Sequence, residues 1–302
     1  MATAHDWLEG ARLRTLPAAA APVLTGAGAA AHLDSFSLGM SLLALGVALA
    51  LQIGVNFAND YSDGVRGTDQ TRVGPTRLTA SGAVPPEKVL SSALISFAVA
   101  ALFGIILVIW SQEWWLLSVG IAAIIAAWFY TGGRRPYGYM GVGLSEVFVF
   151  LFFGLVATVG TTYVQTHSAP RWVWIAGAGI GFISVALLMV NNIRDLYEDE
   201  KVGKYTLAVR LGERPARLLY VVLVVGAAIA GGIAQSGSGV AMQESVSVGF
   251  LLLAASAPGA FAISKGIQGR ALLGTLRNTG LYALFYGILM GAVFAFGIGG
   301  IW

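Results

Sequence analysis

The chain has 302 residues, of which 57% are hydrophobic and 11% charged, with a formal net charge of +3 and a mean hydropathy of +0.76. A chain this apolar cannot bury its surface in one water-soluble core, so composition excludes a soluble globular protein and indicates a polytopic membrane protein. The absence of cysteine excludes disulfides, thiolate nucleophiles, zinc–thiolate sites and iron–sulfur clusters.

Nine apolar segments are long enough, at roughly 17 to 25 residues, to cross a bilayer as helices. They cover approximately residues 12–31, 36–59, 88–110, 114–131, 142–164, 171–193, 216–235, 245–264 and 279–301. Lys and Arg fall almost entirely on one side of this topology, with only Arg171 on the other. Because loops rich in Lys and Arg stay in the cytoplasm, we predict a multi-pass protein of the inner (cytoplasmic) membrane with a cytoplasmic amino terminus.

The amino-terminal segment begins with a charged stretch and continues into an Ala-rich run, as a signal peptide does. Asp6 and Glu9 spoil the basic start that a signal peptide needs, so we expect a retained helix. Trp7 is predicted to lie at the headgroups while Arg12 and Arg14 stay in water. A positive-inside anchor explains these two arginines at least as well as a catalytic role does.

The second apolar segment ends in polar side chains that are costly in lipid. It reads Asn-Phe-Ala-Asn-Asp-Tyr-Ser-Asp from residue 56 to residue 63. Asn56, Asp60 and Asp63 follow i, i+4, i+7 spacing, which places them along one helical face. We call residues 56–63 the first motif.

A second motif ends the sixth apolar segment, over residues 191–199. Asn191 and Asp195 repeat Asn56 and Asp60 at a displacement of 135 residues, and Asp199 extends the same face. Four of the five asparagines of the chain lie in the two motifs. The neighbouring charged residues of the second motif are expected to be solvated or locally paired, namely Arg194, Glu198 and Glu200.

Polar connections follow both motifs, and we predict that they form two cytoplasmic lid loops. They carry the cations Arg72, Arg77, Lys201 and Lys204. The loop after the fourth segment contains Tyr130, Arg134 and Tyr139, and Glu146 follows at the start of the fifth segment. These four side chains are candidates for binding a substrate, with a structural pairing of Glu146 to Arg134 or Arg135 as the alternative.

The spacing of the motifs predicts an internal repeat within a single membrane domain. The second and sixth segments cross in the same direction, so their motifs lie at the same membrane face. Two parallel halves, about 1–131 and 142–264, with a ninth helix over about 279–301, would form a ring around a central cavity. We therefore predict an all-α fold of about nine transmembrane helices.

Converging carboxylates repel one another unless they bind a cation. Oxygen ligands without nearby His or Cys favour Mg²⁺. The predicted metal ligands are Asn56, Asp60, Asp63, Asn191, Asp195 and Asp199. Basic lids beside such a metal suggest a phosphate group, and a membrane cavity suggests an organic part soluble in lipid. A prenyl diphosphate satisfies both conditions.

In this interpretation, Arg72, Arg77, Lys201 and Lys204 bind the diphosphate as it departs, and an electron-rich acceptor attacks the resulting allylic carbocation. The residues predicted to be catalytic are Asp60, Asp195, Asp199 and Lys201.

The two motifs resemble those of the UbiA superfamily of intramembrane prenyltransferases, which end helices two and six of a nine-helix bundle. The opening run from Ala11 to Ala19 and the Tyr-Thr-Gly-Gly run from Tyr130 resemble its naphthoate-prenylating branch. The resemblance implies transfer of a polyprenyl chain to 1,4-dihydroxy-2-naphthoate, with loss of carboxylate and diphosphate, to give demethylmenaquinone. Gly67 stands where many relatives have a third Asp, and Arg134 stands where many have Lys.

Other functions remain open at this point. A different aromatic acceptor, such as 4-hydroxybenzoate, shares all of the metal chemistry. A CDP-alcohol phosphotransferase needs Ala-Arg where Gly67 and Thr68 stand, and its second Asp cluster lies nearby in sequence. A cation-coupled transporter also carries carboxylates within the membrane, but near its middle.

Overall fold

The computed structural model describes residues 2–68 and 77–297. This part of the chain is helical and contains no strand. The α-helices are α1 (Ala4–Ala11), α2 (Leu16–His32), α3 (Leu38–Arg66), α4 (Pro86–Ser111), α5 (Leu116–Thr131), α6 (Leu144–Val149), α7 (Ala157–Thr166), α8 (Arg171–Lys201), α9 (Leu207–Leu211), α10 (Glu213–Gly237), α11 (Met242–Ser264) and α12 (Leu272–Phe296). A π-helix, η3 (Phe150–Val156), joins α6 to α7, and the 3₁₀ turns are η1 (Leu13–Thr15), η2 (Tyr137–Tyr139) and η4 (Gly269–Ala271).

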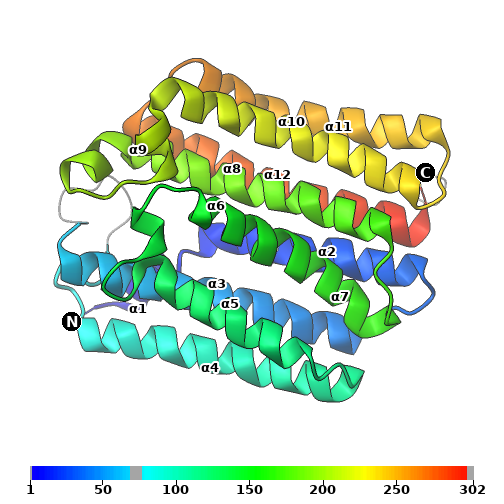
Figure 1. The fold of residues 1–302 in the computed structure, drawn as a ribbon, viewed down its shortest axis with the longest axis horizontal. Helices are drawn as coiled ribbons and strands as arrows, with labels where there is room; N and C mark the ends of the chain where they lie inside the picture. Colours follow the sequence, from blue (N-terminus) through cyan, green and yellow to red (C-terminus); the bar gives the residue numbers. More distant parts are fainter. Residues whose placement is uncertain (1, 69–76, 298–302) are drawn as a thin grey trace.

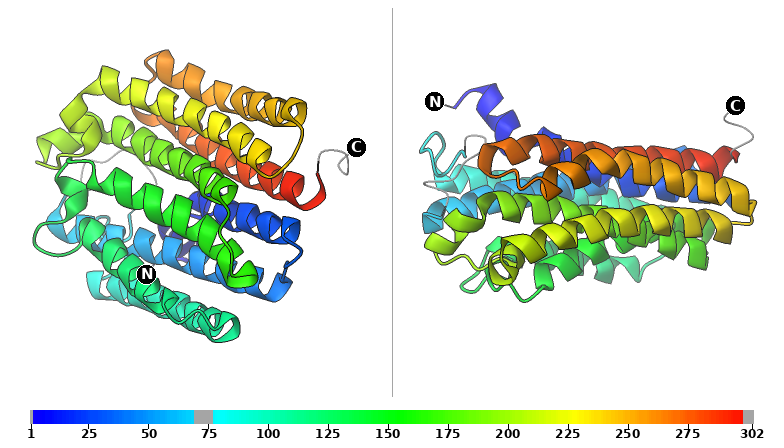
Figure 2. Two further views of the ribbon diagram at one scale, coloured as in Figure 1. Left: turned by 45° about the vertical axis from the view of Figure 1, so that its right-hand side comes forward. Right: turned by 90° about the horizontal axis from the view of Figure 1, so that it is seen from above.

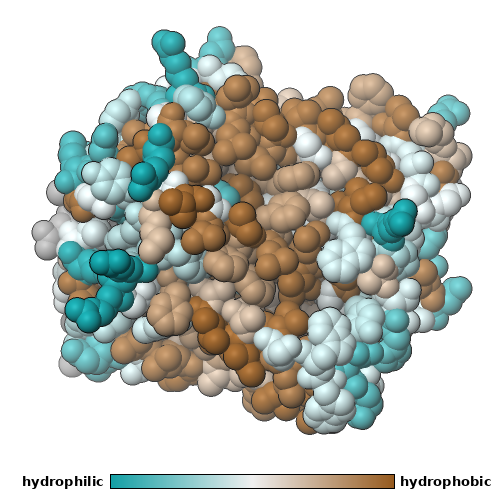
Figure 3. All heavy atoms as spheres, viewed as in Figure 1, coloured by the Kyte–Doolittle hydropathy of each residue, from teal (hydrophilic) through white to brown (hydrophobic). Residues whose placement is uncertain are grey.

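The all-helical membrane fold predicted from the sequence is confirmed. Among the described residues, seven helical stretches are long and apolar enough to cross a membrane, and α5 is a shorter apolar helix. Helix α2 occupies the first predicted segment but has only 17 residues and is not among the seven. Apolar side chains cover the middle of the face shown in Figure 3, and polar ones gather toward its two ends.

The long helices run side by side, as Figures 1 and 2 show. Helix α3 packs most extensively on α4, α8 on α10, and α2 on α12. In the most apolar stretch of α8, 67% of the residues are buried, against 22% in α3 and in α4. Helix α8 is therefore central, and the outer faces of α3 and α4 are left for lipid.

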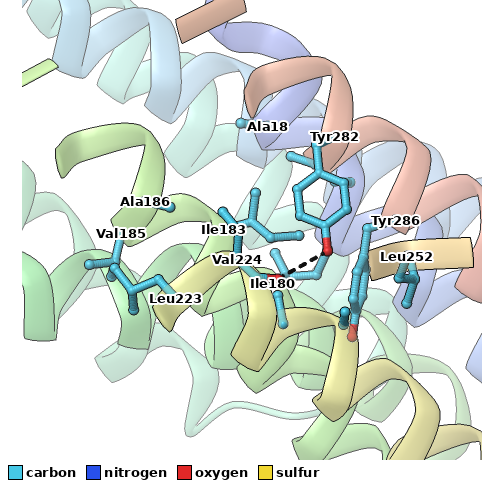
Figure 4. Close-up of a cluster of buried hydrophobic side chains, with 14 of the residues drawn as sticks. Ala18, Ile180, Ile183, Val185, Ala186, Leu223, Val224, Leu252, Tyr282 and Tyr286 are labelled. Carbon is cyan, nitrogen blue, oxygen red and sulfur yellow. Dashed lines mark hydrogen bonds between the residues drawn. The ribbon is translucent and has the colours of Figure 1, made fainter. Parts of the chain in front are cut away.

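Buried side chains of α8, α10 and α12 form the main core (Figure 4). Ile180 and Ile183 pack there beside Tyr282, whose hydroxyl donates to the carbonyl oxygen of Val224 at 3.4 Å. A buried hydroxyl needs such a partner, because no water compensates it in the membrane. Lipid is as apolar as these side chains, so close packing stabilises this core more than removal from water does.

Glycine pairs allow two helix contacts to be very close. A Cβ atom on Gly28 of α2 would lie 2.1 Å from the carbonyl oxygen of Gly291 in α12, and one on Gly154 of η3 would lie 2.4 Å from the Cα of Gly181 in α8. Small residues commonly mediate such contacts in membranes. The second contact draws η3 tightly against α8.

Candidate active site

The ends of α3 and α8 that carry the two motifs lie at the same end of the bundle, on the left in Figure 1. A cavity of about 710 Å³ opens between them. Asn56, Asn59 and Asp60 of α3 line it, as do Asn191 and Arg194 of α8. Although 135 residues separate the repeated positions, both motifs face one cavity.

Both motif helices end in the same turn. After α3, the N–H of Thr68 donates to the carbonyl oxygen of Asp63 at 3.1 Å, and Gly67 has φ of 75°. After α8, the N–H of Lys204 donates to the carbonyl oxygen of Asp199 at 2.8 Å, and Gly203 also has φ of 75°. This is the Schellman arrangement, in which a left-handed glycine reverses the chain. The reversal carries Lys204 back over the second motif.

Lys204 joins the two motifs electrostatically. Its Nζ lies 3.5 Å from Oδ2 of Asp63 and 3.9 Å from Oδ1 of Asp199, and its side chain is only 12% exposed. The same ammonium lies 5.0 Å from the centre of the Tyr139 ring. One cation therefore contacts a carboxylate from each motif.

Tyr139 supports Asp63 from the other side. Its hydroxyl donates a short hydrogen bond to Oδ1 of Asp63. Burial, and then the negative charge of Asp63, raise the pKa of the Tyr139 phenol above its ordinary value. The phenol therefore stays protonated and remains a donor.

Asn56 is tied to the amino-terminal segment. Its Nδ2 donates to the carbonyl oxygen of Ala11 at 2.9 Å and to Oγ1 of Thr15 at 3.1 Å. Its Oδ1 accepts from Gln52 at 3.3 Å. These bonds fix the turn that contains Arg12, a non-glycine residue with φ of 52° and ψ of 58°. Asn56, predicted as a metal ligand, is thus also a positioning group.

Asp60 is tied to the loop that precedes α4. Its Oδ2 accepts from the backbone N–H of Leu78 at 3.0 Å, and its Oδ1 accepts from the N–H of Thr79 at 2.9 Å. A carboxylate offers about four lone-pair positions, so these two bonds leave capacity for a further ligand. Arg77, next to this anchor point, lines the cavity.

Asp195 forms a bidentate pair with its own neighbour. Nε and Nη2 of Arg194 lie 2.6 Å from Oδ1 and Oδ2 of Asp195, and the two side chains are 5% and 3% exposed. The local pairing expected of Arg194 is therefore present. Its position in the cavity wall was not foreseen.

The donor set of the two motifs fits Mg²⁺ chemically, because it consists of carboxylate and amide oxygens with no His or Cys. The contact of one ammonium with both Asp63 and Asp199 shows that the motifs lie close enough for one cation to bridge them. However, the described residues contain no group of three or more His, Cys, Asp or Glu arranged to hold a metal. Asp60, Asp63, Asp195 and Asp199 bind donors of the protein in this structure, and their role as metal ligands stays a prediction.

The cavity wall is much more cationic than the sequence predicted. It contains Arg12, Arg14, Arg77, Arg194 and Arg277. Within the described residues, the Nη2 atom of Arg12 is buried without a hydrogen-bond partner. A partly buried cation with an unpaired donor suits an anionic ligand.

Arg277 was assigned to a loop because the last apolar segment was predicted to begin at residue 279. Helix α12 begins at Leu272, so this arginine lies within the helix and faces the cavity. Its side chain is exposed and lies in the second turn of the helix. The prediction missed it by misplacing the helix start.

Lys201 does not line the cavity. Its Nζ lies 2.9 Å from Glu198, and its side chain is 68% exposed. It follows Asp199 by two residues, about 200° around the helix, and therefore points away from Asp199. Arg72 lies outside the described residues.

The four acceptor-loop candidates occupy different places. Tyr130 lines the cavity, whereas Arg134 is exposed at the surface. Tyr139 contacts Asp63, as described above. Glu146 is 9% exposed and does not line the cavity. Within the described chain, its Oε1 atom is buried without a hydrogen-bond partner, so this oxygen pairs with neither Arg134 nor Arg135.

Aromatic rings continue the wall from Tyr130. The ring of Tyr130 lies 5.6 Å from that of Tyr137, and the Tyr137 ring lies 5.0 Å from that of Phe148. These three side chains and Phe152 line the cavity. One part of the cavity is therefore cationic and another is aromatic and apolar.

Comparison with known proteins agrees with this arrangement. The model of the UbiA prenyltransferase family matches residues 19–270. The chain is 44% identical to 1,4-dihydroxy-2-naphthoate octaprenyltransferase of Mycobacterium tuberculosis, over 98% of this chain and 99% of that protein. It is 37% identical to the Escherichia coli protein of the same name, over 74% of each.

Solved structures show the same fold at low sequence identity. A UbiA homolog from Archaeoglobus fulgidus bound to GPP and Mg²⁺ superposes with a TM-score of 0.69 at 15% identity, over 95% of this chain and all of that one. A UbiA homolog from Aeropyrum pernix K1 gives a TM-score of 0.63 at 15% identity, over 91% and 95% of the two chains. The chain belongs to the UbiA prenyltransferase family and is a prenyltransferase of the membrane.

Proposed function

We propose that this enzyme transfers a polyprenyl chain from a polyprenyl diphosphate to 1,4-dihydroxy-2-naphthoate in the presence of Mg²⁺. The carbon–oxygen bond of the allylic diphosphate breaks, a carbon–carbon bond to the naphthoate ring forms, and the acceptor loses its carboxylate as CO₂. The products are demethylmenaquinone, in its reduced form, and diphosphate.

One observation carries this proposal: a single cavity joins a polar end built from both motifs to an aromatic and apolar wall. A diphosphate attached to an isoprenoid has the same division between charge and apolar surface. The identity of the acceptor rests on the relatives, which are named for 1,4-dihydroxy-2-naphthoate.

The polar end of the cavity is suited to holding the diphosphate. Arg12, Arg77 and Arg194 line the cavity and would supply donors and positive charge for the oxygens that become negative as the bond breaks, and Lys204 adds a positive charge beside Asp63. Asn56, Asp60, Asp63, Asn191, Asp195 and Asp199 would hold Mg²⁺. When bound, this ion neutralises the diphosphate and makes it a better leaving group.

The aromatic wall is suited to the acceptor and to the first part of the prenyl chain. Tyr130, Tyr137 and Phe148 present ring faces and edges on which a naphthalene ring can pack. The negative faces of these rings also stabilise a nearby carbocation.

The predicted topology forms part of the proposal. The Lys and Arg distribution supports a cytoplasmic motif end of the bundle in the inner membrane. The identical turns after α3 and α8 support the proposed repeat of two parallel halves, about 1–131 and 142–264.

The direct test uses purified protein with labelled geranyl diphosphate, Mg²⁺, and either 1,4-dihydroxy-2-naphthoate or 4-hydroxybenzoate. We expect a prenylated product and CO₂ from the naphthoate, and loss of both when EDTA removes the metal. Product from the benzoate alone would overturn the acceptor assignment. Absence of product with either acceptor would reject the reaction.

A further inference from the structure

The loop between α5 and α6 is tied to the chain segments that follow both motifs. Arg66, at the end of α3, donates to the carbonyl oxygens of Thr131 and Gly133. From the other half, Nε of Arg210 in α9 donates to the carbonyl oxygen of Met140 at 3.0 Å. Figure 1 shows this loop at the same end of the bundle as α9. The loop therefore connects the two halves of the site.

The 3₁₀ turn η2 within this loop directs two tyrosines to different places. Successive residues of a 3₁₀ helix are about 120° apart, so Tyr137 and Tyr139 point in different directions. The side chain of Tyr137 lines the cavity, and its hydroxyl donates to the carbonyl oxygen of Ala126 at 2.8 Å. Tyr139 does not line the cavity, and its hydroxyl donates to Asp63. The side chain of Tyr139 is therefore directed at the first motif.

Two cations flank the ring of Tyr139. The guanidinium carbon of Arg66 lies 5.5 Å from the centre of the ring, and Nζ of Lys204 lies 5.0 Å from it. Both distances are within the range of cation–π attraction. The Tyr139 hydroxyl also lies 3.3 Å from Oγ1 of Thr68. Because the ring and the hydroxyl are both held, the donor that Asp63 accepts is already in place before a ligand arrives.

The two carboxylate oxygens of Asp63 have different partners. Oδ1 accepts from the hydroxyl of Tyr139, whereas Oδ2 lies 3.5 Å from Nζ of Lys204. The same ammonium lies 3.9 Å from Oδ1 of Asp199, so Oδ2 is the oxygen of Asp63 that faces the second motif. Asp63 is 2% exposed, and a buried oxygen that loses its donor is costly. Tyr139 thus commits Oδ1 to the protein and leaves Oδ2 for a cation between the motifs.

We propose that Tyr139 is a positioning residue for the metal ion, because its hydroxyl fixes the Asp63 carboxylate with Oδ2 as the ligand atom. This inference rests on the proposed function, in which Asp63 holds Mg²⁺, and it assigns Tyr139 to a metal ligand instead of to the acceptor. Loss of a hydrogen-bond partner of a metal ligand typically lowers metal affinity by roughly 10- to 100-fold. Without the hydroxyl, both oxygens of Asp63 can turn toward Lys204, whose ammonium then competes with the metal.

The test is the metal affinity of Tyr139→Phe in the purified full-length protein. The protein is titrated with Mn²⁺ in the presence of inorganic diphosphate, and free Mn²⁺ is followed by electron paramagnetic resonance. We expect the Kd for Mn²⁺ to rise about tenfold or more, although Phe keeps the ring between Arg66 and Lys204. Turnover should fall at low Mn²⁺ and recover at saturating Mn²⁺, while the KM for the acceptor stays unchanged. A purely structural role would not give this recovery.

Tyr197→Phe is the matched control. The hydroxyl of Tyr197 also donates to a carboxylate, at 2.7 Å from Oε2 of Glu213, but this residue is 52% exposed and does not line the cavity. This variant should keep the wild-type Kd for Mn²⁺. An unchanged Kd in Tyr139→Phe, or an equal rise in the control, would overturn the role of Tyr139.

Two further outcomes separate this proposal from the proposed function. A higher KM for the acceptor in Tyr139→Phe, at wild-type affinity for Mn²⁺, would overturn the positioning role and place Tyr139 in the acceptor site. Failure of the wild-type protein to bind Mn²⁺ with diphosphate would reject the proposed metal site, and the role of Tyr139 with it. The titration needs no acceptor, so its result holds even if the acceptor assignment fails.

Discussion

The two motifs look alike in sequence but are held by different partners. In the first motif, Asn56 and Asp60 bond the main chain of the amino-terminal segment and of the loop before α4. In the second, Asp195 and Asp199 contact the side-chain cations Arg194 and Lys204. Asn56 and Asp60 therefore organise the wall of the cavity through the main chain, whereas Asp195 pairs with a cation of that wall and Lys204 links Asp199 to Asp63 of the first motif.

Because of this difference, substitutions at equivalent positions of the repeat should not have the same effect on structure and turnover. Main-chain hydrogen bonds from a buried carboxylate hold a segment in place, so losing them changes structure as well as chemistry. Side-chain ion pairs can rearrange when a ligand arrives. The following substitutions separate the two roles.

Asp60→Asn should have the largest effect. The amide cannot accept from both Leu78 and Thr79 as the carboxylate does, and each charged hydrogen bond contributes about 1.5–3 kcal/mol. We expect turnover to fall by at least about 100-fold. Hydrogen exchange should also accelerate at the amides of residues 78 and 79. Unchanged exchange at these amides would contradict an organising role for Asp60.

Asp195→Asn should reduce turnover by about 100-fold without affecting exchange at residues 78 and 79. It leaves Arg194 without its bidentate partner, which destabilises a nearly buried cation. Adding Arg194→Gln should recover the melting temperature but not the turnover. Recovery of both in the double variant would show that the pair is purely structural.

Lys204→Met should lower turnover about tenfold while increasing the affinity for divalent cations. Its ammonium lies near Asp63 and Asp199, so its removal leaves their negative charge less compensated, by about 1 kcal/mol or more. Direct titration with Mn²⁺ would measure this affinity independently of turnover. Lys204→Arg keeps the charge and serves as the control. Weaker cation binding in Lys204→Met would refute the electrostatic link between the motifs.

Arg12→Gly should raise the KM for the prenyl diphosphate about tenfold, because it removes a cation from the cavity wall. Glycine adopts the φ of 52° found here without strain, so the melting temperature should not fall. Arg12→Ala keeps the strain and should melt lower than Arg12→Gly. A wild-type KM in both variants would show that Arg12 does not bind the diphosphate and serves only to fix the orientation of the chain in the membrane.

Lys201→Ala should have the smallest effect, within about twofold in turnover, because exposed ion pairs such as Lys201–Glu198 contribute little. The comparison with Lys204→Met is direct, since both lysines follow the same motif. A fall in turnover as large as that of Lys204→Met would restore the catalytic role that the sequence suggested for Lys201.

The sequence predicted the features that polar residues in apolar helices reveal. Asn56, Asp60, Asn191 and Asp195 could be found because each is costly in lipid without a function. Helical spacing and parallel crossing then predicted the common end of the bundle at which both motifs lie. The all-helical membrane fold followed from apolar length alone.

The sequence could not predict features that depend on where a helix ends and how the chain turns. The distinction between Lys201 and Lys204 depends on Gly203, whose left-handed conformation sends the chain back across the motif. Arg277 was missed because boundaries are the least reliable part of a helix prediction. The partners of Asp60 lie 18 and 19 residues away in a loop, and loop contacts follow no sequence periodicity from which they could be predicted.

The central claim is that the two motifs act together on one diphosphate. It is tested most directly by equilibrium binding of a labelled, non-hydrolysable prenyl diphosphate analogue with Mg²⁺ to the wild-type protein and to Asp63→Asn and Asp199→Asn. The account predicts metal-dependent binding in the wild-type protein and a loss of about tenfold or more in affinity in each variant, although the two residues lie on different helices. Wild-type affinity in either variant would contradict it.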